Sequence, residues 1–347
     1  MNFAIREVTD TPNLERIIDL EILIWGLAER DAVPSNVLHP IIQNGGVVLA
    51  TYDDDQPIGL SIAFPTNTRI LWSHITGIHP DYRNQGIGYQ LKYHQRKWAQ
   101  QHGYKAIHWT FDPLQRRNAH FNINVLGASV AHFHPNFYGQ LRDGINAGLP
   151  SHRLEVRWPV DTNNKTQIDN HDDSQFLLAS SSNYEPDLQA FTAYQGSLNI
   201  EIPYDINKLK RENTQAAHRW SSAVCDAFAQ ALLHSYEVIG FITDGERCWY
   251  TLTPPRPWYL YVVQCNDDSL YTGITTDVIR RIQQHNAGRG AAYTAARRPV
   301  ELRGVWSFPD QSTALRAEIR FKRQHRKAKL ESLDSGKPFA GGQPWTP

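Results

Sequence analysis

The sequence is poor in the residues that would build a disulfide framework or cross a membrane. It has three cysteines among 347 residues, and Cys225, Cys248 and Cys265 form no C-x-x-C pair, which excludes a disulfide scaffold and a zinc site of that kind. We expect these thiols to be reduced and buried. No run reaches the ~18 consecutive apolar residues of a membrane span, and residues 1–7 lack a basic segment followed by an apolar one. A cytoplasmic protein with no membrane partner is therefore expected.

The sequence also has no net charge, because 35 Lys and Arg balance 35 Asp and Glu. That balance conceals a division along the chain. Residues 254–347 contain 15 basic and 8 acidic residues, whereas residues 1–253 contain 20 and 27. A positive last part is expected if only that part approaches a polyanion. With 41% hydrophobic residues and 10 Trp, the chain can bury real cores, and its length predicts two or three domains.

The most informative stretch lies between residues 258 and 288. Alternating apolar residues on both sides of a polar turn at 266–269 predict a β-hairpin. A helix follows, capped by Thr275 or Thr276 and ended by Gly288. Arg281 and His285 are four residues apart, so they share one face of this helix.

This stretch resembles the GIY-YIG nuclease family, especially its small stand-alone bacterial members. Tyr259-Leu260-Tyr261 stands at the first motif, of which only the tyrosine is kept, and Tyr271-Thr272-Gly273 stands at the second. Arg281 and His285 match the family's helix positions, and the family's more distal asparagine has no counterpart. The resemblance covers roughly the last quarter of the chain and continues through residues 288–291, 297–302 and 314–318.

The resemblance implies an endonuclease that cuts nucleic-acid phosphodiesters. By their places in the motifs, Tyr261 is expected to activate the attacking water, with Tyr271 beside it, and Arg281 is expected to hold a phosphate. Glu318 is expected to bind one Mg²⁺, and His285 is either a phosphate contact or an ordinary helix residue. The alternatives are a packed tyrosine pair, a surface Arg281, and a Glu318 that pairs with a lysine one turn on.

Basic residues surround these positions and predict a nucleic-acid partner, with DNA favoured. Such contacts bind the phosphate backbone without reading sequence, and no base-reading module is visible. The alternative is a solvated basic face. The residues are Arg289, Arg297, Arg298, Arg303, Arg316, Arg320, Lys322, Arg323, Arg326, Lys327 and Lys329.

A second signal lies in the front half, where a predicted strand at 69–78 leads through a glycine-rich turn into a predicted helix at 89–101. The turn comprises Arg83, Asn84, Gln85, Gly86, Ile87 and Gly88. Unpaired backbone N–H groups at a helix start suit a pyrophosphate, although a simple tight turn is an alternative. With the predicted strand at 106–111 and helix at 118–126, this order resembles the GNAT superfamily of acetyl-CoA-dependent acyltransferases, which implies acetyl-CoA and an amine acceptor.

The acid and base of such a transferase are less evident in the sequence. Family members often place a tyrosine in the last helix, where this chain has Ile123 or Asn124. Tyr138 is the nearest substitute for the acid, and His74 is a candidate base. Each is also explained as an ordinary buried or surface residue. A non-catalytic relative of the family is a further alternative.

We therefore expect an α+β protein with three segments. Residues 1–160 form a GNAT-like mixed sheet with flanking helices, and residues 161–253 form a loop (161–187) plus an α+β extension. Residues 254–347 form a small GIY-YIG α/β sandwich after a proline-rich linker. The predicted function is an acetyl-CoA-dependent N-acyltransferase joined to a Mg²⁺-dependent endonuclease. In the alternative, the last domain docks on nucleic acid without cutting it.

Overall fold

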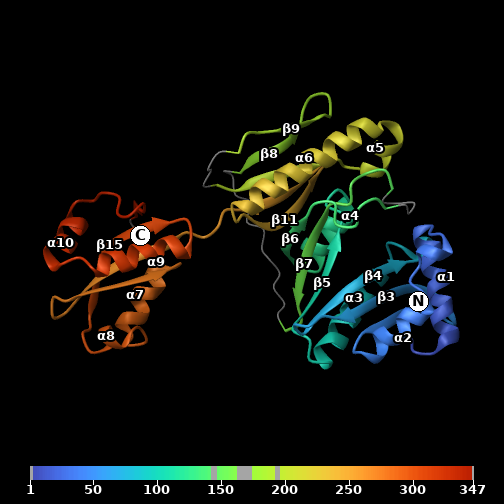
Figure 1. Ribbon diagram of the computed structural model, residues 1–347, viewed down its shortest axis with the longest axis horizontal. Helices are drawn as coiled ribbons and strands as arrows, with labels where there is room; N and C mark the ends of the chain where they lie inside the picture. The colour runs from blue at the N-terminus through green and yellow to red at the C-terminus, as the bar shows by residue number, and fades with distance from the viewer. Residues whose placement is uncertain (1–2, 142–146, 162–173, 192–195, 346–347) are drawn as a thin grey trace. The chain divides into compact units, whose positions relative to one another are not determined.

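The computed structural model describes residues 3–141, 147–161, 174–191 and 196–345. The chain forms two compact units, Met1–Pro254 and Pro255–Pro347 (Figure 1). Both units mix helices and strands, so the predicted α+β class is confirmed. In the described part of the chain, no helix combines the length and the apolar character that crossing a membrane requires.

The first unit is built on a mixed sheet of seven described strands in the order β1-β2-β3-β4-β5-β7-β6. Only β4 and β5 pair in parallel; the other neighbours are antiparallel. β2 and β3 are almost continuously buried because both faces of the sheet are covered. The strands are β1 (Ala4–Glu7), β2 (Val47–Asp53), β3 (Gln56–Pro65), β4 (Ile70–Ile78), β5 (Ala106–Phe111), β6 (Ser129–His134) and β7 (Arg153–Pro159).

Helices cover the two faces of this sheet. Leu14 and Leu38, from the first two helices, pack with Val48 of β2, whereas Leu91 of the third packs with Leu49 of the same strand. Because neighbouring strand residues point to opposite faces, these helices lie on opposite sides. The helices are α1 (Thr11–Trp25), α2 (Ser35–Gln43) and α3 (Ile87–Gln101).

A second sheet completes the first unit, with five described strands in the order β11-β12-β10-β8-β9. One apolar cluster runs through both sheets and joins Leu154 of β7, Phe228 of the long helix α6 and Tyr250 of β12. The predicted loop at 161–187 is wrong in part, because β8 and β9 lie in it; residues 162–173 are outside the described residues. The elements are β8 (Gln175–Ser180), β9 (Pro186–Leu188), β10 (Leu198–Ile202), α5 (Ile206–Glu212), α6 (Thr214–Leu233), β11 (Glu237–Asp244) and β12 (Arg247–Thr253).

The helix predicted at 118–126 differs from a regular α-helix. A short α4 (Arg116–Ala119) continues as the π-helix η3 (His120–Val125). Asn124 bonds the second sheet through both ends of its amide, donating to the carbonyl of Phe241 at 2.6 Å and accepting from its N–H at 3.1 Å. Asn124, one of the two positions that the sequence offered for a catalytic tyrosine, therefore carries a structural amide.

The second unit is a sheet of four described strands, β14-β13-β15-β16, between helices (Figure 1). Leu260 and Val262 of β13 pack with Phe321 of α9, whereas Tyr261 and Val263 pack with Val278 of α7. The elements are β13 (Trp258–Cys265), β14 (Leu270–Thr275), α7 (Val278–Asn286), α8 (Ala292–Ala295), β15 (Val300–Phe308), α9 (Gln311–Lys322), α10 (Arg326–Asp334) and β16 (Gln343–Pro344).

Two local expectations need correction. The cap of α7 is Asp277, whose side chain accepts from the N–H of Arg280 at 2.9 Å; Thr275 instead accepts from the N–H of Asp277 at 3.1 Å. Aspartate is at least as good a cap as threonine, and this cap lies one residue after Thr276 and two after Thr275. Cys248 and Cys265 are buried as predicted, but Cys225 is half-exposed.

Candidate active sites

A connected group of polar contacts in the second unit surrounds the phenol of Tyr261 on β13. Tyr261 is fully buried, and its oxygen lies 2.8 Å from Nε2 of His285. Nε of Arg281 donates to the same phenol oxygen at 3.3 Å. Both partners lie on α7, and they share one face of that helix because they are four residues apart. Three of the five residues predicted to be catalytic are therefore in direct contact.

The surrounding hydrogen bonds assign the protons on this group. Thr294 donates its hydroxyl proton to the carbonyl of Ala291 at 2.9 Å, so its oxygen accepts from Nδ1 of His285 at 2.6 Å. Neutral His285 consequently carries its proton on Nδ1 and accepts the Tyr261 proton at Nε2. Thr294 is a residue that the sequence did not reveal, because a buried threonine after a glycine turn has no distinctive pattern.

Two glycines let the rings of this group come this close. A Cβ on Gly273, which pairs with Tyr261 across the strands, would lie 2.6 Å from the phenol oxygen. A Cβ on Gly290 would lie 2.3 Å from Nδ1 of His285. Both contacts are shorter than a carbon atom tolerates, so each ring occupies space that only glycine leaves open.

Burial decides the protonation of the pair. It raises the pKa of Tyr261 to about 12, against the lowering effect of the hydrogen bond from Arg281. Burial, helped by the positive charge of Arg281, lowers the pKa of His285. Near neutral pH the phenol therefore holds its proton, and a neutral imidazole is ready to accept it.

Tyr271 lies beside this group, diagonally across from Tyr261. Its strand partner is Val263, and its ring centre is 6.4 Å from that of Tyr261 and 5.2 Å from that of His285. On its other side it stacks with the exposed Tyr293 at 6.0 Å. Tyr271 thus packs between the Tyr261–His285 pair and Tyr293.

An open pocket of about 200 Å³ lies next to Arg281. Threonine hydroxyls and two guanidinium groups line it, and these are donors that suit a phosphate. Arg281 also donates to Oε1 of Gln284 at 3.1 Å, which holds its side chain along the pocket. The lining residues are Trp258, Ile274, Thr275, Thr276, Arg280, Arg281 and Gln284.

Glu318 lies on α9, and its most direct contact is with Lys322. Lys322 donates to Oε1 of Glu318 at 2.7 Å, which is the alternative pairing that the sequence suggested. The Glu318 charge is nevertheless near enough to Tyr261 to contribute to its raised pKa. Among the described residues, no group of three or more His, Cys, Asp or Glu side chains could together hold a metal ion. Mg²⁺ needs few protein oxygens because it keeps its waters, so one carboxylate fits it.

Most of the basic residues predicted to meet nucleic acid are exposed, and some are paired. Arg289, Arg320 and Arg323 are exposed. Arg297 bonds Asp267 at 2.8 Å, and Lys322 bonds Glu318 as described above. An exposed ion pair of this kind contributes little stability, so a phosphate can replace the partner of such an arginine at small cost.

In the first unit, the glycine-rich turn predicted to hold a pyrophosphate leads into α3. Gly86 is the N-terminal cap of α3 and has φ +77°, a conformation that favours glycine. A Cβ on Gly86 would meet nothing within 4 Å, so the space above the turn is open. The first amides of α3 have no partner within the helix. Arg83, Asn84, Gln85 and Gly86 are exposed at this helix start, whereas the predicted Ile87 is buried and Gly88 is half-buried.

The turn lies near a separation between two strands. β4 and β5 are paired only from Ile70 and Ala106 to Trp72 and His108, although β4 continues to Ile78 and β5 to Phe111. His74, the predicted base, is the unpaired residue of a bulge against β3 and is exposed. Tyr138, the predicted acid, is also exposed, and its phenol oxygen lies 3.2 Å from the hydroxyl oxygen of Thr110 on β5.

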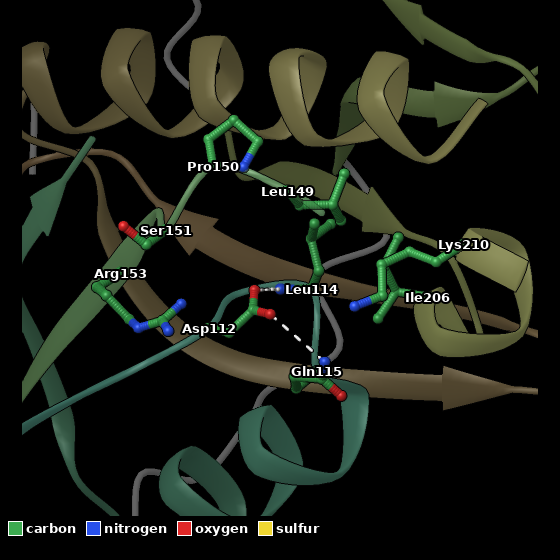
Figure 2. A pocket seen from close by; sticks show the side chains of 9 residues that line it. All are labelled: Asp112, Leu114, Gln115, Leu149, Pro150, Ser151, Arg153, Ile206 and Lys210. Carbon is green, nitrogen blue, oxygen red and sulfur yellow. Dashed lines mark hydrogen bonds between the residues drawn. The ribbon is translucent and has the colours of Figure 1, made fainter. Parts of the chain in front are cut away.

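A small cavity in the first unit cannot hold a cofactor. Figure 2 shows Asp112 and Gln115 facing Lys210 and Ile206 of α5. Burial raises the pKa of Asp112, and its carboxylate accepts from the N–H of Leu114 at 2.9 Å. The volume is about 10 Å³, which is about the space of one water molecule. This cavity is part of the packing between the sheets.

Comparisons with known proteins agree with two enzyme-family domains in one chain. The family model of the GIY-YIG catalytic domain matches residues 257–331, and that of the GNAT acetyltransferase family matches residues 14–122. A UPF0213 protein of Cupriavidus pinatubonensis is 51% identical over 75 residues, which are 22% of this chain and 83% of that protein. A UPF0213 protein of Streptococcus agalactiae is 49% identical over 81 residues, which are 23% of this chain and 92% of that protein.

Solved acetyltransferases resemble the first unit at low sequence identity. A ribosomal-protein alanine N-acetyltransferase of Escherichia coli is 12% identical with a TM-score of 0.38, covering 48% of this chain and 100% of that one. A GNAT acetyltransferase of Elizabethkingia anophelis with acetyl-CoA bound is 16% identical with a TM-score of 0.35, covering 46% and 98%. The chain belongs to the GIY-YIG family through its second unit and carries a GNAT family domain in its first. Both predicted resemblances are confirmed.

Proposed function

We propose that the second unit is an endonuclease that hydrolyses nucleic-acid phosphodiesters, with DNA as the favoured substrate. The observation that carries this proposal is the chain of hydrogen bonds from Arg281 through Tyr261 and His285 to Thr294. A tyrosine that only packs against its strand neighbours does not require this chain of hydrogen bonds. It is what a buried phenol requires in order to move a proton.

In this reaction Tyr261 takes a proton from the attacking water while giving its own proton to Nε2 of His285. This relay avoids a free phenolate, which the raised pKa of Tyr261 disfavours. The guanidinium of Arg281 stabilises negative charge on the phenol oxygen, and its remaining donors face the pocket of about 200 Å³ where a phosphate fits. His285 later returns the proton.

Glu318 is the residue that would hold Mg²⁺ in this proposal. The ion would neutralise charge on the phosphoryl oxygens and help the departing oxygen. Lys322 now occupies one oxygen of Glu318, so ion binding would weaken that pair.

The test is cleavage of nicked, flapped and branched DNA by the full chain with and without Mg²⁺. Tyr261→Phe, Arg281→Ala and Glu318→Ala should each lower the cleavage rate about 10²-fold or more, because each removes a charge or a proton carrier from the transition state. Ser332→Ala, on α10 and outside the site, serves as the control. DNA binding without any cleavage by the wild type would favour a docking role, and cleavage unaltered by these changes would reject the site.

We further propose that the first unit is an acetyl-CoA-dependent N-acyltransferase, in which residues 161–253 complete the core begun by residues 1–160. The turn from Arg83 to Gly88 would place backbone N–H groups on the pyrophosphate of the cofactor. The separation between β4 and β5 would receive the thioester end of acetyl-CoA.

Calorimetry of the full chain with acetyl-CoA tests this second proposal. Gly86→Glu should abolish the heat of binding, because it puts a carboxylate where the phosphates lie and strains a backbone with φ +77°. Gly103→Ala, at another positive φ with open space around it, is the matched control and should retain binding. Equal binding by wild type and Gly86→Glu would show that the turn is not the site.

A further inference from the structure

A histidine of the first unit occupies an unusual environment at the separation of β4 and β5. His108 on β5 is 9% exposed. Its neighbour Trp109 faces α3, where Nζ of Lys92 lies 3.9 Å above its ring. His108 therefore points to the opposite face of the sheet. It pairs with Trp72 at the last paired position before the two strands part.

A carboxylate on the adjacent strand β7 holds this imidazole. Nδ1 of His108 lies 2.8 Å from Oε1 of Glu155, and Oε2 of Glu155 lies 2.8 Å from Nε2 of His134 on β6. An ionised carboxylate only accepts hydrogen bonds, so both imidazoles donate. Neutral His108 consequently has its proton on Nδ1 and a lone pair on Nε2. Within the described residues, that Nε2 is buried and has no hydrogen-bond partner.

A buried polar nitrogen is normally bonded, so the lone pair of His108 calls for a donor that the described residues do not supply. An attacking amine is such a donor. We propose that His108, oriented by Glu155, is the general base of acyl transfer and takes a proton from the acceptor amine. This inference rests on the proposed acyltransferase function and assigns it a catalytic residue in place of the exposed His74.

The transfer balances as follows. The nitrogen of a primary amine attacks the acetyl carbonyl carbon, the N–C bond forms, and the C–S bond breaks with its electron pair going to sulfur. Nε2 of His108 takes the proton from nitrogen, and the imidazolium then passes it through solvent to the thiolate, which leaves as free coenzyme A. Glu155 stabilises the imidazolium while it exists.

Several charged groups surround His108. Burial raises the pKa of Glu155, but the hydrogen bonds from His108 and His134 outweigh burial and hold this pKa below its usual value. Glu155 is therefore ionised near neutral pH. On β7, Arg157 is in register with His108. On β6, His132 is in register with Glu155, and β4 contributes the uncharged Trp72.

The experiment compares the full-length wild type with His108→Gln, Glu155→Gln and the control His218→Gln, which changes an exposed histidine of α6. Acetyl-CoA affinity is measured by calorimetry and should stay within about 2-fold. Release of coenzyme A is followed from pH 5.5 to 9 with spermidine, a lysine peptide, a peptide with a free N-terminus and an aminoglycoside. His108→Gln should lower the rate about 10²- to 10⁴-fold and remove the rise of rate with pH.

Glu155 is a positioning residue, so Glu155→Gln should shift the pH profile and reduce the rate less than His108→Gln does. Nitrogen-15 NMR of the imidazoles gives a reading that needs no acceptor: neutral His108 should show the Nδ1–H tautomer. A neutral Nε2–H tautomer would overturn the assignment whether or not any amine is acetylated, and so would a wild-type rate and pH profile in His108→Gln. A wild type that binds no acetyl-CoA would instead reject the acyltransferase function itself.

Discussion

The replacement Gly273→Ala tests the nuclease site without removing any of its functional groups. Gly273 lies opposite Tyr261 in the hairpin, and an added Cβ would be 2.6 Å from the phenol oxygen and 2.9 Å from the ring carbon that bears it. Ordinary contact begins at 3.4 Å. The phenol must therefore retreat by about 0.8 Å, the difference between these values, or the strands must separate.

That shift is large for a group held at 2.8 Å from His285 and 3.3 Å from Arg281. A misplacement of about 1 Å can cost ~10²-fold in rate, so we expect Gly273→Ala to lose roughly 30- to 100-fold in cleavage. Overpacking of a core costs about 1–3 kcal/mol in unfolding free energy. The variant should still fold, with a lower melting temperature.

Initial rates of DNA cleavage at saturating Mg²⁺, together with thermal unfolding by circular dichroism, measure both effects. Gly304→Ala is the matched control, because its Cβ would also be too close, at 2.5 Å, but to the flexible end of Leu333. Its cleavage rate should stay within about 3-fold of the wild type. A Gly273→Ala protein that cuts as fast as the wild type would refute the requirement for an accurately placed phenol.

Three further outcomes follow from the charges. Cleavage should rise with pH through the pKa of His285, which burial lowers, because only neutral imidazole accepts the Tyr261 proton. A pH–rate profile checks this, and the rise should be absent in His285→Gln. Burial lowers the pKa of Lys92 to about 7, so above pH 7 the folded state binds fewer protons than the unfolded state. The unfolding free energy should therefore increase with pH by up to about 1.4 kcal/mol per pH unit. Urea unfolding of wild type and Lys92→Met at pH 7, 8 and 9 should show that slope only in the wild type. DNA affinity should fall steeply with salt, and Arg289→Ala should reduce the slope of log affinity against log salt by about 0.9 if Arg289 contacts a phosphate.

The elements with strong periodicity or flanking turns were accessible from the sequence. The strand at 106–111 has the predicted bounds, because a short polar segment ends it. The strands β8 and β9 were not, since they are short and lie in a stretch rich in Asn, Asp and Ser. β8 pairs with β10, which comes later in the chain, and β9 pairs with β8; local patterns do not record such partners.

The candidate sites divide in the same way. Motif order sufficed to bring Tyr261, Arg281 and His285 together, because a hairpin and the helix after it are local structures. Thr294 and the pairing of His108 with Glu155 were not predictable, since these contacts depend on tertiary packing or strand register. His74 was preferred as a base from its place on a strand, and the bulge that exposes it is not visible in the sequence.

The apolar cluster that runs through both sheets of the first unit also bears on how such a protein is assembled in evolution. A recombination point near residue 160 would divide a single core and separate Leu154 from Phe228, which belong to the same apolar cluster. A point between Pro254 and Pro255 divides no cluster, because the second unit has cores of its own. Recombination that keeps every core intact is therefore expected between the two units and not within the first.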